Sequence, residues 1–187
     1  MSFPGIPSLD AAVMAFIQTH FHNTVTDTVF PIITSLGEAG IGWIVLSLVL
    51  LCFKKTRRTG GLVLIAMTVT LLFGELTLKN IICRLRPCNV FTDFPMLIAR
   101  PTSYSFPSGH TSSSFAAALI LTLRHKKVGW LAYIPAVLIA FSRIFLFVHY
   151  PTDVLAGILL GTPAISSTYF AAKAIQKRQA EKRTAQI

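Results

Sequence analysis

Four polar residues interrupt an apolar stretch late in the chain. Ser142, Arg143, His149 and Asp153 lie in the segment SRIFLFVHYPTD, between WLAYIPAVLIAF and VLAGILLG, which are both suited to a lipid bilayer. A charge at membrane depth costs about 3 kcal/mol on insertion scales, so charged groups in such a place indicate a functional site.

The spacing of these residues suggests what chemistry they do. His149 and Asp153 are four residues apart, which lets the carboxylate bond one imidazole nitrogen, fix the tautomer and leave the other nitrogen more basic. Arg143 offers a forked donor that suits phosphate oxygens. Simpler alternatives remain: an interfacial histidine that tolerates water, and an ion pair between Arg143 and Asp153.

Two further segments carry residues of the same kind. Lys79 and Arg86 are seven residues apart, so on a helix they lie on nearly the same face and could enter one pocket. Basic side chains at helix ends also commonly extend to the membrane interface, and this alternative stays open.

The segment PSGH, residues 107–110, precedes an apolar helix. Ser108 and Gly109 place backbone N–H groups at a helix N-terminus without a bulky side chain, which is a natural anion site. Capping of the helix by Ser108 is the simpler interpretation of that residue alone. His110 adds a proton donor beside the anion site.

Taken together, these residues predict phosphoryl transfer. The cations and amides would surround a tetrahedral dianion, one histidine oriented by Asp153 would attack phosphorus, and the other would protonate the departing oxygen. Fixed protein charge would replace the metal that kinases use. The acidic residues are few and scattered, so neither a divalent metal nor another cofactor is expected.

Composition predicts the elements that position these groups. Of the 187 residues 53% are hydrophobic and 13% charged, the mean hydropathy is +0.64, and apolar runs recur along the chain. We therefore expect an all-α, polytopic transmembrane helical bundle of about six helices. It forms a single domain, residues 1–187, in which 1–35 is an interfacial or first-helix region and 173–187 a basic tail.

The net charge of +10 does not indicate a nucleic-acid partner. Most basic residues lie beside apolar spans, in the segments 54–58 and 124–127 and in the tail. The positive-inside rule then places these segments and the C-terminus in the cytoplasm of a multi-pass plasma-membrane protein. Residues 79–110 and 149–153 must both lie on the extracytoplasmic side, where the candidate site is expected.

Three other features are left open by the sequence. Cys83 and Cys88 lack CxxC spacing, and a disulfide between them would require an oxidising compartment. Arg84 and Arg100 lie outside the motifs, and we expect them to contact a second phosphate or the lipid surface.

The motifs K-x6-RP (79–87), PSGH (107–110) and SR-x5-H-x3-D (142–153) resemble the three signatures of the type 2 phosphatidic acid phosphatase superfamily, over about residues 35–172. The resemblance implies that His149 forms a phosphohistidine, Asp153 orients it and His110 is the general acid. It also implies that the phosphate is held, without metal, by a set of five residues: Lys79, Arg86, Ser108, Gly109 and Arg143.

The resemblance further implies a membrane lipid phosphate as substrate. Undecaprenyl diphosphate, converted to undecaprenyl phosphate, is the expected one, and phosphatidylglycerophosphate, phosphatidate or lipid A are alternatives. A vanadium-dependent haloperoxidase shares the pocket residues, but those relatives are larger and soluble. A non-enzymatic lipid-binding protein is a further alternative, and the oligomeric state is left open.

Overall fold

The computed structural model describes residues 3–162, and these form helices and loops without a strand. The all-α fold class is therefore confirmed. The α-helices are α1 (Ser8–His20), α2 (Thr24–Leu36), α3 (Ile41–Cys52), α4 (Arg57–Thr70), α5 (Lys79–Ile82), α6 (Pro87–Val90), α7 (Gly109–Arg124), α8 (Tyr133–Phe145) and α9 (Pro151–Gly161). A π-helix (Leu71–Leu78) joins α4 to α5, and 3-10 turns lie at Glu38–Gly40 and Gly129–Ala132.

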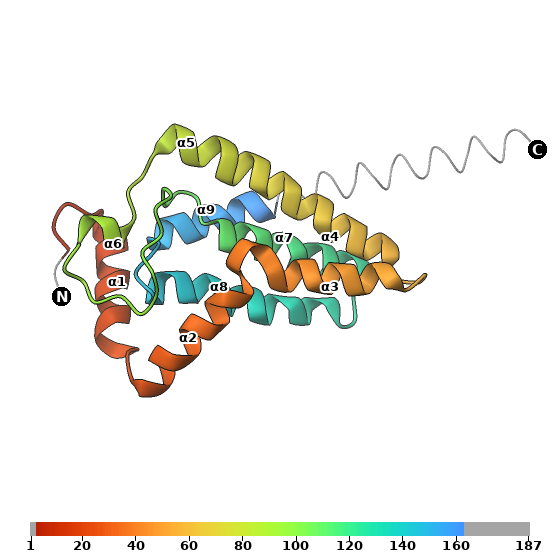
Figure 1. Cartoon of the computed structure of the whole chain (residues 1–187), viewed down its shortest axis with the longest axis horizontal. Coiled ribbons are helices and arrows are strands. Elements are labelled where there is room, and N and C mark those ends of the chain that lie inside the picture. Colours follow the sequence, from red (N-terminus) through yellow and green to blue (C-terminus); the bar gives the residue numbers. More distant parts are fainter. Residues whose placement is uncertain (1–2, 163–187) are drawn as a thin grey trace, which may run out of the picture.

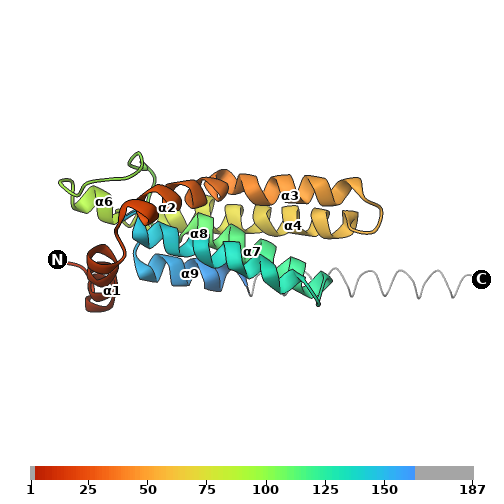
Figure 2. The same cartoon turned by 90° about the horizontal axis from the view of Figure 1, so that it is seen from below.

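Helix α7 is the centre of the bundle. It packs against α4, α8 and α9, and α3 covers α4, so that the long helices run side by side (Figures 1 and 2). Its middle carries three fully buried alanines, Ala116, Ala117 and Ala118. A Cβ on Gly157 of α9 would lie 2.7 Å from the carbonyl oxygen of Ser108. Small side chains thus let these helices approach closely, as is typical of membrane bundles.

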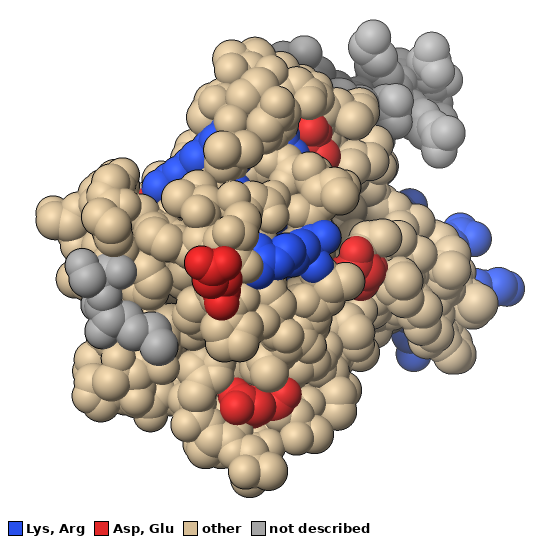
Figure 3. Space-filling model, turned by 60° about the vertical axis from the view of Figure 1, so that its left-hand side comes forward, with Lys and Arg blue, Asp and Glu red and all other residues tan. Residues whose placement is uncertain are grey.

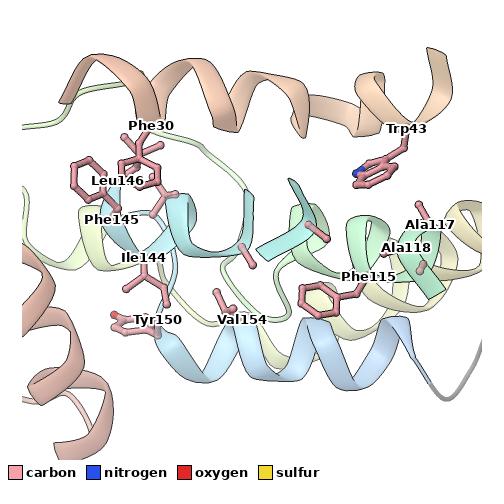
Figure 4. Packing of buried hydrophobic residues seen from close by; sticks show 14 of the residues in the cluster. Phe30, Trp43, Phe115, Ala117, Ala118, Ile144, Phe145, Leu146, Tyr150 and Val154 are labelled. Atoms are coloured by element: carbon pink, nitrogen blue, oxygen red, sulfur yellow. The ribbon is translucent and has the colours of Figure 1, made fainter. Parts of the chain in front are cut away.

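Larger side chains fill the space between the helices (Figure 4). The Trp43 ring of α3 donates a hydrogen bond of 2.9 Å from its indole N–H to the Ser114 hydroxyl of α7. Phe30 of α2 packs against Phe145 at the end of α8, with ring centroids 4.5 Å apart. These contacts attach α2 and α3 to the central helices and fix the end of α8 that leads to His149.

Helix α1 lies across one end of the bundle, where it packs against α8 and α9 (Figures 1 and 2). Its Gln18 side chain donates to the carbonyl oxygens of Ile144 and Phe145, at 3.3 and 3.1 Å. A capping box at Asn23, which accepts from the amides of Val25 and Thr26, then starts α2. The region predicted as interfacial thus holds two helices, one of them fastened to the end of α8.

Within residues 3–162, one helix, Arg57–Val90, is long and apolar enough to cross a membrane alone. The pair Thr24–Leu36 and Glu38–Cys52, bent by 46°, could form a second span, and two shorter apolar helices cover Gly129–Phe145 and Pro151–Gly161. The number of about six membrane-crossing helices stays a prediction. The tail 173–187 lies outside the described residues.

The two basic loops lie at the same end of the bundle. The Thr59 hydroxyl at the start of α4 bonds Nε2 of His125 at 3.1 Å, and the Nε of Arg124 lies 3.5 Å from the same oxygen. These two contacts join the segments that the positive-inside rule assigns to the cytoplasmic side of the membrane. The residues 79–110 and 149–153 lie toward the opposite end, as the topology argument predicted.

Candidate active site

The three motif segments converge around one cavity of about 900 Å³. Six of the eight predicted site residues line it: Lys79, Arg86, Gly109, His110, Arg143 and His149. Ser108 and Asp153 are fully buried. Seen from the end of the molecule that carries α1 and α6, basic side chains lie between acidic ones (Figure 3). Residues separated by up to 70 positions in sequence therefore form one charged pocket.

His149 lies in the loop between α8 and α9, with 1% of its surface exposed. Nη1 of Arg86 lies 2.9 Å from its Nε2. Because arginine has only donors, Nε2 must accept, so the imidazole is neutral and carries its proton on Nδ1. Burial lowers the pKa of His149 well below its usual range, and the charges of Arg86 and Arg143 lower it further. His149 is therefore a neutral base with Nε2 directed at the cationic group.

Asp153 occupies the third position of α9, where it accepts a hydrogen bond of 2.9 Å from the Tyr150 amide at Oδ2. The same oxygen lies 3.4 Å from Nδ1 of His149, the nitrogen that carries the proton. The predicted pair therefore meets at a distance longer than an ordinary hydrogen bond. Nδ1 has no hydrogen-bond partner among the described residues, so the orienting role of Asp153 stays a prediction.

Three buried cations surround the imidazole. Lys79 is 5% exposed, Arg86 4% and Arg143 3%. Lys79 donates to both carboxylate oxygens of Glu75, at 2.7 Å each. In residues 3–162 no carboxylate forms an ion pair with either arginine. Buried charge without a counterion is costly, so the two guanidinium groups favour an anionic ligand in this cavity.

The arginines are held by neutral acceptors. Arg86 donates from Nε to the Ser103 carbonyl at 2.7 Å and from Nη1 to the Val148 carbonyl at 2.9 Å. Arg143 donates from Nη1 to the Thr34 hydroxyl of α2, and its buried Nε has no partner among the described residues. Both side chains are thus fixed in place while donor capacity is left for a ligand.

The start of α7 supplies the rest of the predicted anion site. The first amides of an α-helix have no partner within the helix, so those of Gly109 and His110 face outward. A Cβ on Gly109 would overlap Oε1 of Glu75, so a larger residue there requires the Glu75 carboxylate to move. His110 lies with Nε2 3.5 Å from Oε2 of Glu38, and this nitrogen is buried without a hydrogen-bond partner.

Ser108 differs from the prediction. Its amide donates to the carbonyl oxygen of Asp153 at 3.1 Å, and its hydroxyl contacts that of Thr111 at 2.9 Å. It also accepts from the Thr111 amide as the N-cap of α7. In this structure that N–H joins the start of α7 to α9, and a role of Ser108 in holding the phosphate stays a prediction.

The expectations for the outer residues also need correction. Arg84 does not face the cavity but binds two carboxylates, those of Asp10 and Asp153, at 2.7 Å each. Arg100 lines the cavity and donates to the carbonyls of three loop residues, Cys88, Thr92 and Phe94. Cys83 and Cys88 are both free.

Sequence reasoning missed the acidic and hydroxyl neighbours of the site. Glu75 lies four residues before Lys79 within an apolar helix, and the cost of a charge at such a place could have identified it. Thr34 and Glu38 come from a bend between α2 and α3 that no motif marks. Their approach to Arg143 and His110 could not be read from spacing.

Residues 59–177 match the PAP2 superfamily. The chain belongs to this family. A similar protein is the undecaprenyl-diphosphatase of Sulfolobus acidocaldarius, 40% identical over 121 residues, which are 64% of this chain and 58% of the relative. Another is the decaprenylphosphoryl-5-phosphoribose phosphatase of Mycobacterium tuberculosis (strain CDC 1551 / Oshkosh), 35% identical over 135 residues, 69% of this chain and 71% of the relative.

The fold is similar to a solved structure. The crystal structure of a transmembrane PAP2 type phosphatidylglycerolphosphate phosphatase from Bacillus subtilis has a TM-score of 0.70 to this chain. The two are 28% identical, and the match covers 94% of this chain and 88% of the other. The predicted family and the predicted type of fold, a helical membrane bundle, are both confirmed.

Proposed function

We propose that this chain is a membrane lipid phosphatase that acts through a phosphohistidine at His149. The observation that carries the proposal is the pair of buried guanidinium groups, Arg86 and Arg143, which face a neutral imidazole and have no carboxylate partner among the described residues. A bound phosphate dianion would neutralise both, and it would lie next to Nε2 of His149, whose electron pair it would release from Arg86.

The reaction divides between the two histidines. Nε2 of His149 forms a bond to phosphorus while the bond to the leaving oxygen breaks, and His110, which enters this step as the imidazolium, gives that oxygen its proton. Water then attacks the phosphohistidine and loses a proton to His110, which restores both rings and releases phosphate. Lys79, Arg86, Arg143 and the first amides of α7 stabilise the charge on the transferred group.

A lipid substrate is supported by the walls of the cavity. Beyond the cationic group it is lined by apolar side chains of α3, α4 and the π-helix, namely Ile44, Leu64, Met67 and Leu71. A phosphate on a long apolar tail fits such a site, because the headgroup meets the charges while the tail stays in apolar surroundings. A non-enzymatic lipid-binding protein would need the cations and the apolar wall but not a neutral histidine backed by Asp153.

We propose undecaprenyl diphosphate as the preferred substrate, in line with the name of the Sulfolobus relative. Cleavage of its terminal phosphate gives undecaprenyl phosphate as the leaving group. Phosphatidylglycerophosphate is the second candidate, because the solved Bacillus protein with the same fold carries that name. Phosphatidate and lipid A remain further alternatives from the family resemblance.

We also propose that the site opens to the extracytoplasmic side of the plasma membrane. The basic loops 54–58 and 124–127 lie together at the end of the bundle away from the cavity, and the positive-inside rule assigns them to the cytoplasm. Labelling of cysteines introduced near residues 56 and 92 in intact cells tests this, since only residue 92 should react from outside.

Phosphate release by the purified protein tests the activity. Undecaprenyl diphosphate, phosphatidylglycerophosphate and phosphatidate are compared in EDTA, with His149→Ala as the inactive variant and His20→Ala, an exposed histidine of α1, as the matched control. We expect release with the wild-type and His20→Ala proteins and none with His149→Ala. An activity that survives His149→Ala, or that requires added metal, would contradict the mechanism.

A further inference from the structure

A second network of buried charge stands behind the nucleophile, away from the cavity. Asp10 of α1 is fully buried, although it belongs to a helix at the end of the bundle. Its Oδ1 accepts from the Thr152 amide at 2.9 Å, and its Oδ2 accepts from the Thr152 hydroxyl at 2.7 Å. A buried carboxylate is stable only when it is paired and hydrogen-bonded, so α1 is fastened at this point to the first turn of α9.

Arg84 completes the network. Nη2 donates to Oδ2 of Asp10 and Nη1 donates to Oδ1 of Asp153, both at 2.7 Å, and the guanidinium carbon lies 3.8 Å from the centre of the Tyr150 ring. The planar fork of an arginine bridges the two carboxylates from two separate nitrogens, whereas a lysine has one nitrogen and no fixed plane to hold both oxygens in these positions.

This network fixes both oxygens of the aspartate that faces the nucleophile. Oδ1 of Asp153 is held by Arg84, and Oδ2 is held by the Tyr150 amide at 2.9 Å. Only then does Oδ2 face Nδ1 of His149, 3.4 Å away. If the bond from Arg84 were lost, the carboxylate could rotate, and the direction of the imidazole would no longer be determined.

We propose that Asp10 and Arg84 are positioning residues, which act through Asp153 to fix the ring and tautomer of His149. The inference rests on the proposed function, since it concerns the same nucleophile. It makes α1 a part of the reaction machinery, although α1 lies outside all three motifs. A purely mechanical tether of α1 to α9 is the competing explanation, and the two differ in what they do to the imidazole.

Kinetics of three variants test the role. Asp10→Asn keeps a hydrogen-bond acceptor for Thr152 but removes the negative charge that balances Arg84. Arg84→Lys keeps the positive charge but removes the planar guanidinium group. We expect each to lower kcat by roughly ten- to a hundredfold while KM stays within about threefold, because the phosphate-binding cations are untouched. Asp27→Asn, which removes a carboxylate paired with His22 in α2, is the matched control and should behave as wild type.

A double variant tests whether the two residues act as one unit. Asp10→Asn with Arg84→Lys should be no slower than Arg84→Lys alone, because the second change breaks a bridge that is already lost. Independent contributions would instead multiply the two losses. Thermal unfolding of each variant checks that the protein is still folded at the temperature of the assay.

A readout that does not depend on turnover is the ¹⁵N spectrum of the His149 ring, assigned by its absence in His149→Ala. The wild-type ring should give the pattern of a neutral imidazole protonated on Nδ1. Asp10→Asn and Arg84→Lys should shift it toward a mixture of tautomers, while Asp27→Asn should not. A mechanical tether would lower the unfolding temperature and leave the ring pattern as in wild type.

These measurements separate the two proposals. An unchanged ¹⁵N pattern of the His149 ring in both Asp10→Asn and Arg84→Lys overturns the positioning role. This holds whether or not kcat falls, and even if His149→Ala is inactive. If the pattern is shifted in the two variants but the wild-type protein releases no phosphate from any lipid, the positioning role is supported and the proposed function is contradicted. A shifted pattern together with the loss of kcat supports both.

Discussion

Arg86 and His149 form a direct hydrogen bond, in which Nη1 donates to Nε2 over 2.9 Å. The electron pair that we propose to attack phosphorus is therefore engaged by a residue that we also propose to bind phosphate. A phosphate that enters the cavity must draw this N–H to one of its own oxygens, and the same movement frees Nε2. Binding and activation of the nucleophile are coupled through one arginine.

Replacement of this arginine tests the coupling. Arg86→Lys keeps the charge, but one ammonium cannot bond the two carbonyls, the imidazole and a phosphate together. We expect kcat/KM to fall by roughly a hundred- to a thousandfold, the usual cost of one transition-state donor. Phosphate release measures it, with Arg58→Lys in the basic loop at the opposite end as the control. A loss of less than about threefold would exclude the coupling.

The sequence predicted the site better than its surroundings. The motifs placed Lys79, Arg86, His110, Arg143 and His149 together, because the basic loops fixed which segments share an end of the bundle and because buried charge needs a partner. These five residues do line one cavity. The all-α fold followed from the recurring apolar runs.

The features of the site that the sequence did not reveal depend on contacts between distant helices. Asp10 lies 142 positions before its partner Thr152, and no periodicity links them. The amide of Ser108 looked free because a helix leaves its first donors unpaired, but the carbonyl of Asp153 reaches it from α9. Arg84 was assigned to substrate because the sequence does not reveal that two carboxylates converge on it.

A methyl group at the start of α7 should disturb the phosphate site. In Gly109→Ala the new Cβ would overlap Oε1 of Glu75, which must then move together with Lys79. Because the carboxylate holds Lys79, its displacement should misplace this cation, and we expect kcat/KM to fall by roughly tenfold. Phosphate release and thermal unfolding measure the effect.

Gly61→Ala in α4 is the matched control, since a Cβ there meets nothing within 4 Å. It should keep full activity and raise stability by about 0.4–1 kcal/mol, because alanine loses less backbone freedom than glycine on folding. Equal activity of the two variants would contradict the close approach of Glu75 to Gly109.

Glu75 should compete with phosphate for Lys79. Its two oxygens each lie 2.7 Å from Nζ, so a phosphate oxygen must displace or share this contact. Glu75→Gln keeps the shape and removes the negative charge, and we expect inhibition by inorganic phosphate to strengthen by roughly fivefold, equivalent to about 1 kcal/mol. Asp27→Asn, another paired carboxylate, should leave the inhibition constant unchanged. A weaker inhibition would instead show that Glu75 helps to hold the phosphate.

The neutral state of His149 predicts how the activity depends on pH. Burial first, and then the charges of Arg86 and Arg143, lower the pKa of this imidazole well below its usual value near 6.5. The nucleophile must be unprotonated, so it is active above its folded-state pKa and is lost only as the pH falls through that lowered value. We therefore expect the acid limb of kcat/KM, which reports the free protein and the free substrate, to have its midpoint below pH 6.5.

A pH series of phosphate release measures this midpoint, with the ionisation of the substrate determined separately by ³¹P NMR. A midpoint at or above pH 6.5 that the substrate does not explain would mean that His149 is protonated in the free protein, and an imidazolium cannot attack phosphorus.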